Sequence, residues 1–273
     1  MTDSPSTTSR TAASDAEGDA WSPAVRVLDL TKEFPGGVRA LGGVSFDIPR
    51  GELTSIIGPS GCGKTTTLKI IAGLVGATSG VVEVNGVPVS QPGPDRAFVF
   101  QDFALMPWAT VLRNAAFGLE LRGVPREERE ETAREYVAKV GLARFEDAYP
   151  HQLSGGMRQR VGLARALAVD ADILLMDEPF ASVDEQIRRK FQDDLLRLLS
   201  DENKTVIFVT HSIEEAVYIF DQVVILTRGP SRVSKVVRPG VDRSGGSDRI
   251  RRSPAYLDWV EQIWAELQSY LET

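Results

Sequence analysis

The chain has 273 residues, a formal net charge of −7, and 42% hydrophobic and 25% charged side chains, a composition that excludes a disordered or fibrous protein. Its longest run without a charged residue, 70–82, has 13 residues, fewer than the roughly 20 apolar residues that span a bilayer. The single cysteine, Cys62, excludes an internal disulfide and a cysteine-based zinc site, and the acidic balance argues against broad nucleic-acid binding.

The N-terminal part predicts a tail followed by strands. Residues 1–24 are rich in Ser, Thr, Ala and Asp and lack an apolar segment, so we expect a disordered tail rather than a secretory signal. Alternating apolar side chains then predict antiparallel strands at 25–30 and 44–48. Short apolar runs bounded by turn residues predict further strands: 53–57, 81–84, 87–89 and 97–100.

The rest of the chain predicts helices that alternate with strands. Helical patterns are expected at these places: 65–72, the highly charged segment 113–143, 184–200 and the residues just after His211. Apolar strands are expected at 173–176, 205–209 and 222–226. Because strands alternate with helices, the sequence predicts an α/β fold with a parallel sheet covered on both faces.

The C-terminal part combines a basic stretch with an amphipathic pattern. Residues 228–252 contain eight Arg or Lys and two acids, which we interpret either as a solvated loop or as a contact with anionic lipid or a partner. Residues 254–271 predict a helix that docks on the domain's own surface. Its apolar residues recur at helical spacing: Leu257, Val260, Ile263, Trp264 and Leu267.

A glycine-rich segment matches the phosphate-binding pattern G-x-x-x-x-G-K-[ST] and lies between a predicted strand and a predicted helix. Glycines let the backbone curl so that N–H groups point inward, and the helix N-terminus adds about half a positive charge. Lys64 is expected to neutralise the β and γ phosphates, and Thr65 to offer its hydroxyl to Mg²⁺. The nucleotide-binding residues expected here are Gly58, Pro59, Ser60, Gly61, Cys62, Gly63, Lys64, Thr65 and Thr66. With Cys62 against the nucleotide, thiol reagents should inactivate the protein and the bound nucleotide should protect it.

Two acids end the apolar run 173–176. Asp177 and Glu178 are therefore expected at the C-terminal edge of a buried strand, beside the phosphate-binding loop. We assign Asp177 to Mg²⁺ and Glu178 to the general base that takes a proton from the attacking water.

A second anion site is indicated by the segment Leu153-Ser-Gly-Gly-Met157. Ser154, Gly155 and Gly156 precede an apolar-periodic run, so Ser154 is expected to cap a helix whose N-terminus attracts anions. The chain would then have two phosphate-binding helix ends.

The order of these motifs resembles the ATP-binding subunit of ATP-binding-cassette (ABC) transporters, over about residues 25–240. The matching features, in chain order, are the Gly58–Thr65 loop, Gln101, Leu-Ser-Gly-Gly at 153–156, Asp-Glu-Pro at 177–179, a loop with Asp184, and His211. The segments 99–114 and 177–180 resemble especially the nitrate, sulfonate and taurine importer branch.

This resemblance implies a head-to-tail homodimer. Each ATP would lie between the phosphate-binding loop of one subunit and Ser154, Gly155 and Gly156 of the other. Asp184 would communicate across the interface between the two subunits.

The resemblance also implies roles for three further side chains. Gln101 would contact Mg²⁺ and sense the γ-phosphate, and His211 would hold the γ-phosphate and water beside Glu178. Phe34 stands where the family stacks an aromatic ring on adenine, and a core aromatic is the alternative interpretation.

The implied architecture is a P-loop NTPase with a RecA-like parallel sheet core, an N-terminal antiparallel β subdomain and a helical insert subdomain. The expected division is a disordered tail (1–24), an ABC ATPase domain (25–240) with the insert at about 102–165, and a basic linker with the C-terminal amphipathic helix (241–273).

The implied function is hydrolysis of ATP with Mg²⁺ to drive import of a small solute, such as nitrate, a sulfonate or taurine. The expected partners are an integral membrane permease and, indirectly, an extracytoplasmic solute-binding protein, which would place the chain peripherally on the cytoplasmic face of the membrane. The apolar run 103–108 would either receive the permease or form a small satellite core. The alternatives are a polyamine, sugar or amino-acid importer, a soluble ABC ATPase in DNA repair or ribosome regulation, and a nucleotide-binding switch.

Overall fold

The computed structural model describes residues 22–181, 185–243 and 246–270, and every structural statement below concerns these residues. The larger of its two sheets has six strands, parallel except for the edge strand β10, which runs antiparallel to its neighbour. Their order across the sheet is β10 (Val233–Val237), β9 (Gln222–Leu226), β3 (Leu53–Ile57), β8 (Thr205–Val209), β7 (Ile173–Asp177) and β6 (Arg96–Val99). The predicted parallel α/β sheet is confirmed.

The smaller sheet is antiparallel and is built from the first strands of the chain. Its order is β2 (Val38–Ile48), β1 (Val25–Phe34), β4 (Ser79–Val84) and β5 (Val87–Pro88). Ala24 is buried and its N–H bonds to the carbonyl of Ile48 at 2.8 Å, so the ordered chain begins before Val25. The rest of the predicted tail, 1–21, lies outside the described residues.

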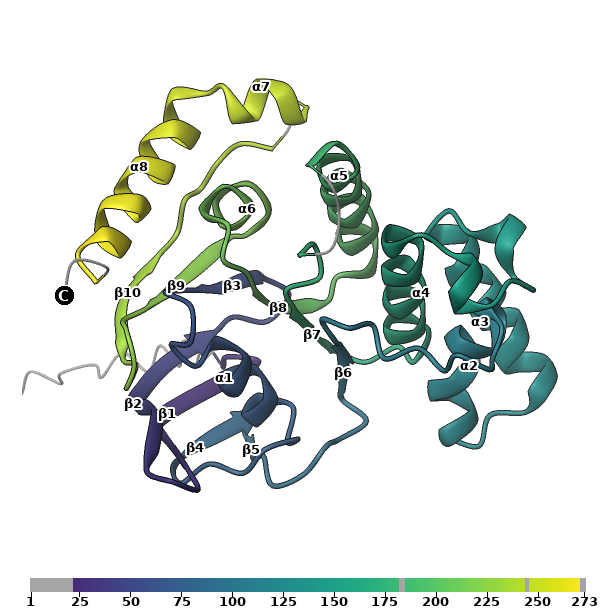
Figure 1. The fold of residues 1–273 in the computed structure, drawn as a ribbon, viewed down its shortest axis with the longest axis horizontal. Coiled ribbons are helices and arrows are strands. Elements are labelled where there is room, and N and C mark those ends of the chain that lie inside the picture. The colour runs from purple at the N-terminus through teal and green to yellow at the C-terminus, as the bar shows by residue number, and fades with distance from the viewer. Residues whose placement is uncertain (1–21, 182–184, 244–245, 271–273) are drawn as a thin grey trace, which may run out of the picture.

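Helices fall into three groups around the sheets (Figure 1). Helix α1 (Lys64–Ile71) lies between the two sheets, and α5 (Glu185–Glu202) and α6 (Ile213–Ile219) lie on the other face of the larger sheet. A separate group stands beside β6: α2 (Val111–Leu121), α3 (Arg126–Lys139), the short helices η1 (Ala143–Phe145) and η2 (Pro150–Gln152), and α4 (Gly155–Ala168). Helices α7 (Ser247–Arg251) and α8 (Pro254–Gln268) close the chain, and α8 packs on α6.

Burial explains why the central strands read as apolar runs and not as alternating patterns. Every residue of β7, β8 and β9 is buried, because helices cover both faces of the sheet. The ring of Phe208 lies 5.4 Å from that of Phe180 and 4.8 Å from that of Phe220. This aromatic packing holds the ends of β7 and β8, from which the predicted catalytic residues emerge.

The basic stretch 228–252 differs from its interpretation as a solvated loop. It contains strand β10, and the side chain of Arg238 donates hydrogen bonds to Glu52 at 2.8 Å and to Gln222 at 3.0 Å. Arg243 pairs with Asp221 at 2.8 Å. These arginines are therefore bonded to acids and amides of their own domain, and the solvated-loop interpretation is wrong for them.

The predicted C-terminal amphipathic helix is present as α8, and its Tyr256 and Ile263 are buried, but Leu257 and Trp264 of the predicted docking face are exposed. Among the described residues, none of the helices combines the length and the apolar content needed to cross a bilayer.

Candidate functional site

The glycine-rich segment forms a tight loop between the end of β3 and the start of α1. Gly61 and Gly63 have φ angles of +75° and +99°, which side-chain-bearing residues rarely adopt. A Cβ atom at Gly63 would lie 2.7 Å from Cδ2 of Leu41, so packing against β2 also requires glycine there. The predicted strand, loop and helix unit is confirmed.

Lys64 begins α1 with its ammonium group held inside this loop. Its side chain is buried, and Nζ donates hydrogen bonds to the carbonyl oxygens of Gly58 at 2.9 Å and of Pro59 at 3.1 Å. The two carbonyls thus hold the buried ammonium group at the place where the sequence pattern predicts bound phosphates.

A cavity of about 390 Å³ opens over the loop, within the usual range for a small-molecule site. It brings together the loop, the two long antiparallel strands and the end of β7. Its lining residues are Phe34, Val38, Ala40, Ser60, Gly61, Gly63, Lys64, Thr65, Thr66 and Glu178. Phe34, the predicted adenine-stacking residue, is far from the loop in sequence but lies on the same cavity wall.

Asp177 and Thr65 meet at the carboxyl edge of the sheet. The hydroxyl of Thr65 donates a hydrogen bond to Oδ1 of Asp177 at 2.8 Å. Burial raises the pKa of Asp177, and the hydrogen bond from Thr65 opposes that rise. A hydroxyl and a carboxylate in contact form an oxygen donor set of the kind that suits Mg²⁺.

Glu178 leaves β7 with an unusual backbone conformation. Its φ angle is +44°, and its N–H bonds to the carbonyl of Val209 on the neighbouring strand at 3.0 Å. Non-glycine residues in this region are uncommon and cluster at functional sites. Oε2 of Glu178 lies 3.3 Å from Nδ1 of His211, whose side chain is 60% exposed. Both predicted catalytic groups therefore face each other at the ends of β7 and β8.

Both residues line a small hollow. It has about 10 Å³ of space, near the minimum for one water molecule, and polar groups of Thr210 and Glu215 share its wall with Glu178 and His211. The arrangement can hold a water molecule within reach of a carboxylate and an imidazole, which is what general-base catalysis requires.

The predicted second anion site is a separate place in the molecule. Ser154 caps α4, and its Oγ accepts a hydrogen bond from the N–H of Met157 at 3.3 Å, while Gly155 and Gly156 form the first turn. Ser154 is exposed, and none of these three residues lines the cavity over the phosphate-binding loop. The chain thus presents two distinct helix N-termini, as predicted.

Several predicted site residues do not line this cavity: Gly58, Pro59, Cys62, Gln101, Asp177 and His211. Gln101 follows β6 on the surface and is not among the described residues that line the cavity. Asp184, assigned to communication between subunits, lies outside the described residues.

Cys62 belongs to the loop only through its backbone. Its side chain is 1% exposed and is part of the core between the sheets, and burial raises the pKa of its thiol. We therefore expect slow modification of the native protein by thiol reagents, in contrast to the ready inactivation predicted from the sequence. The measurement is the rate of thiol labelling at pH 8 against a denatured control, and equal rates would contradict the buried placement.

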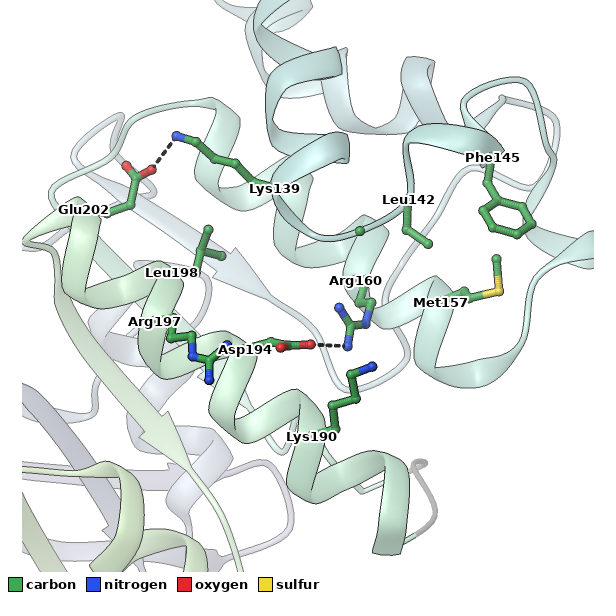
Figure 2. Close-up of a pocket in the computed structure, with 11 residues that line it drawn as sticks. Lys139, Leu142, Phe145, Met157, Arg160, Lys190, Asp194, Arg197, Leu198 and Glu202 are labelled. Atoms are coloured by element: carbon green, nitrogen blue, oxygen red, sulfur yellow. Dashed lines mark hydrogen bonds and ion pairs between the residues drawn. The ribbon is translucent and has the colours of Figure 1, made fainter. Parts of the chain in front are cut away.

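A larger hollow of about 660 Å³ lies away from the loop, between α5 and the helical group (Figure 2). Two ion pairs cross it, from Arg160 of α4 to Asp194 at 2.8 Å and from Lys139 of α3 to Glu202 at 2.9 Å. The first contact ties α4, which Ser154 caps, to α5, and the second ties α3 to α5. Neither phosphate-binding loop residues nor Glu178 line this hollow.

Sequence reasoning missed Glu215, which is 5% exposed and accepts a hydrogen bond from Thr210 at 2.6 Å. The sequence signal for it is its place three residues after Ser212, the N-cap of α6, in the first turn of that helix.

Comparison with known proteins gives a consistent result. Residues 41–181 match the ABC transporter family. An uncharacterized ABC transporter ATP-binding protein of Methanocaldococcus jannaschii is 50% identical over 242 residues, which cover 88% of this chain and 89% of that protein. The taurine import ATP-binding protein TauB of Chromobacterium violaceum is 47% identical over 243 residues, with coverage of 87% and 93%.

A solved structure shows the same fold. It is an ATP-binding cassette in a dimeric post-hydrolysis state bound to ADP and Pi, and it aligns with a TM-score of 0.71 and 34% sequence identity. The alignment covers 78% of this chain and 98% of that one.

Proposed function

Since the chain belongs to the ABC transporter family, and is an ATPase coupled to transport, we propose that it energises the import of a small anionic solute through a separate membrane permease. The observation that carries this proposal is the facing pair Glu178 and His211. Glu178 lines the cavity over the phosphate-binding loop, and both residues line the small hollow. A module that only binds nucleotide needs no such pair.

In this mechanism ATP occupies the cavity of about 390 Å³. Its phosphates lie against the loop, where the buried ammonium of Lys64 and the N-terminus of α1 provide positive charge. The adenine stacks on Phe34, whose ring lines the same wall.

Glu178 takes the proton from the attacking water as that water approaches the γ-phosphate. Its partner His211, 3.3 Å away, orients the water and contacts the γ-phosphate. The hydrogen bond from the backbone of Glu178 to Val209 fixes the start of the side chain, so the carboxylate is already in place before ATP binds.

The contact between Thr65 and Asp177 fits a Mg²⁺ site, because both supply hard oxygen donors at the cavity edge. Bound Mg²⁺ would neutralise charge on the β and γ phosphates. Gln101 is proposed as a further ligand that senses the γ-phosphate from the surface beyond β6.

The two separate helix N-termini support a head-to-tail homodimer. Ser154, Gly155 and Gly156 lie outside the cavity of their own subunit, so they are available to the ATP of a second copy. The solved relative is dimeric, which favours the same assembly here. Asp184 is proposed to communicate between the two sites.

The relatives favour a sulfonate as the solute. Taurine import proteins of Chromobacterium violaceum, Rhizobium johnstonii and Yersinia pestis are 45–47% identical to this chain. We propose taurine or another small sulfonate, with nitrate as a further anion of the same branch, delivered by an extracytoplasmic binding protein. The chain would lie on the cytoplasmic face of the membrane, with 25–240 as its ATPase domain, 102–165 as its helical insert and 241–273 as its C-terminal linker and helix.

The test is reconstitution of the chain with the permease and binding protein encoded alongside it. ATP hydrolysis in proteoliposomes should rise when the binding protein is loaded with taurine, and should stay basal with a polyamine or a sugar. Stimulation by a sugar or polyamine alone would assign the chain to another importer branch, and the absence of ATP hydrolysis would contradict the proposed chemistry.

A further inference from the structure

His211 lies between two residues whose hydrogen bonds lead away from the site. Thr210 is buried, and its hydroxyl donates to Oε2 of Glu215 at 2.6 Å. The N–H of Ser212 donates to the same hydroxyl oxygen of Thr210 at 3.0 Å. Through Thr210, the chain on both sides of His211 is therefore connected to the carboxylate of Glu215.

That carboxylate is in turn tied to α5. Glu215 is 5% exposed, and its second oxygen, Oε1, accepts a hydrogen bond from Nε2 of Gln192 at 3.1 Å. Burial raises the pKa of Glu215, whereas the hydrogen bonds from Thr210 and Gln192 and the positive charge of Arg188 oppose that rise. We call Gln192, Glu215 and Thr210 the polar relay.

A residue of the basic stretch near the C-terminus, Arg251, contacts the polar relay. Nη2 of Arg251, on α7, donates to Oε1 of the buried Gln192 at 2.6 Å. The guanidinium carbon of Arg251 lies 4.0 Å from the centre of the Tyr218 ring, a distance typical of a cation–π contact. Two contacts therefore hold Arg251 over α5 and α6.

Donor and acceptor chemistry gives the polar relay one direction. Arginine only donates, so Gln192 must present its oxygen to Arg251 and its NH₂ to Glu215. The Glu215 carboxylate then accepts from both sides, which requires Thr210 to donate its hydroxyl hydrogen to it. The free lone pairs of Thr210 are left to accept from the N–H of Ser212. Without Arg251, the buried oxygen of Gln192 loses its donor, and of these contacts only the hydrogen bond to Glu215 still holds the amide.

We propose that Arg251 is a positioning residue for ATP hydrolysis, which acts on His211 through the polar relay. The inference rests on the proposed role of His211. It gives a function to Arg251, a residue of the basic stretch that does not itself contact the catalytic site. The C-terminal segment thus helps to set the position of His211 relative to Glu178, whose Oε2 lies 3.3 Å from Nδ1 of His211.

The first test is Arg251→Met in the full-length chain. Methionine keeps an apolar side chain over Tyr218 but cannot donate to Gln192, so the polar relay loses its outer anchor and holds the segment around His211 less firmly. We expect kcat for ATP hydrolysis to fall roughly 10- to 100-fold, the scale of a small misplacement of catalytic groups. KM for ATP should stay unchanged, because Arg251 does not line the cavity over the phosphate-binding loop.

Two variants separate positioning from general effects. Arg249→Met removes the same charge from an exposed position of the same short helix and should leave kcat unchanged. Arg251→Lys restores a donor and should recover part of the lost rate. Thermal unfolding of all three variants, compared with the original chain, shows whether a loss of kcat reflects unfolding.

A double-mutant cycle with His211→Ala shows whether Arg251 acts through His211 or independently of it. If Arg251 acts through His211, Arg251→Met should cause no further loss in the His211→Ala background. Equal losses in both backgrounds, or an unchanged kcat for Arg251→Met beside an impaired His211→Ala, would overturn this inference while leaving the proposed function intact. An unchanged rate for His211→Ala would instead overturn the role of His211 and this inference with it.

Discussion

Replacement of Glu178 with Gln is expected to lower steady-state ATP hydrolysis by roughly 10²- to 10⁴-fold, the usual contribution of a general base. Glutamine has nearly the same shape, so it preserves the backbone at a φ angle of +44° and the contact with Val209. It cannot accept the proton of the attacking water. ATP should therefore bind with unchanged affinity but persist, and the ATP-bound dimer should accumulate.

The measurements are the rate of phosphate release, the dissociation constant for ATP, and the oligomeric state with ATP by size-exclusion chromatography. Glu127→Gln is the matched control, because it removes the same charge from an exposed position in the first turn of α3. Unchanged hydrolysis by the Glu178 variant would refute its assignment as the base. A lost affinity for ATP would show instead that Glu178 serves mainly in binding.

Replacement of Lys64 with Ala should weaken ATP binding by about 10- to 100-fold or more, since hydrogen bonds to charged groups contribute roughly 1.5–3 kcal/mol each. The ammonium is held by two carbonyls of the loop, so it meets the phosphates without first being ordered. Its removal leaves these carbonyls facing the phosphates with no positive charge between them. Hydrolysis should fall with binding.

Fluorescence titration with a nucleotide analogue measures this effect. Lys69→Ala is the control, since it removes the same charge from the last turn of the same helix, outside the cavity lining. An affinity loss of equal size in both variants would mean that the general charge of α1, and not the placement of Lys64, governs binding.

The parts of the site that lie on regular elements could be predicted from the sequence. Asp177 and Thr65 meet because a buried strand and the phosphate-binding loop both end at the carboxyl edge of one parallel sheet. Ser154 was identified as a helix cap by the glycines and the apolar period that follow it. These inferences need only local pattern and the geometry of the sheet.

Other features depend on packing that local pattern does not encode. The orientation of Cys62 is set by the core between the two sheets, which is built from segments more than 100 residues apart. The polar relay and Arg251 join side chains of α5, α6, α7 and the residue after β8, so no single segment carries their signal. Strand β10 was not predicted, because Ser234 and Lys235 interrupt its apolar residues. Such polar residues are typical of a strand at the edge of a sheet.

That edge strand has a consequence for the solubility of the subunit before it assembles. A flat, apolar sheet edge invites pairing with other chains and hence aggregation. Here β10 has only five residues, carries Lys235, and is fastened to the end of α8 through a hydrogen bond between Ser234 and Tyr270 at 2.7 Å. Strand β10 therefore covers the edge of β9, whose residues are all buried, against β-pairing with another chain.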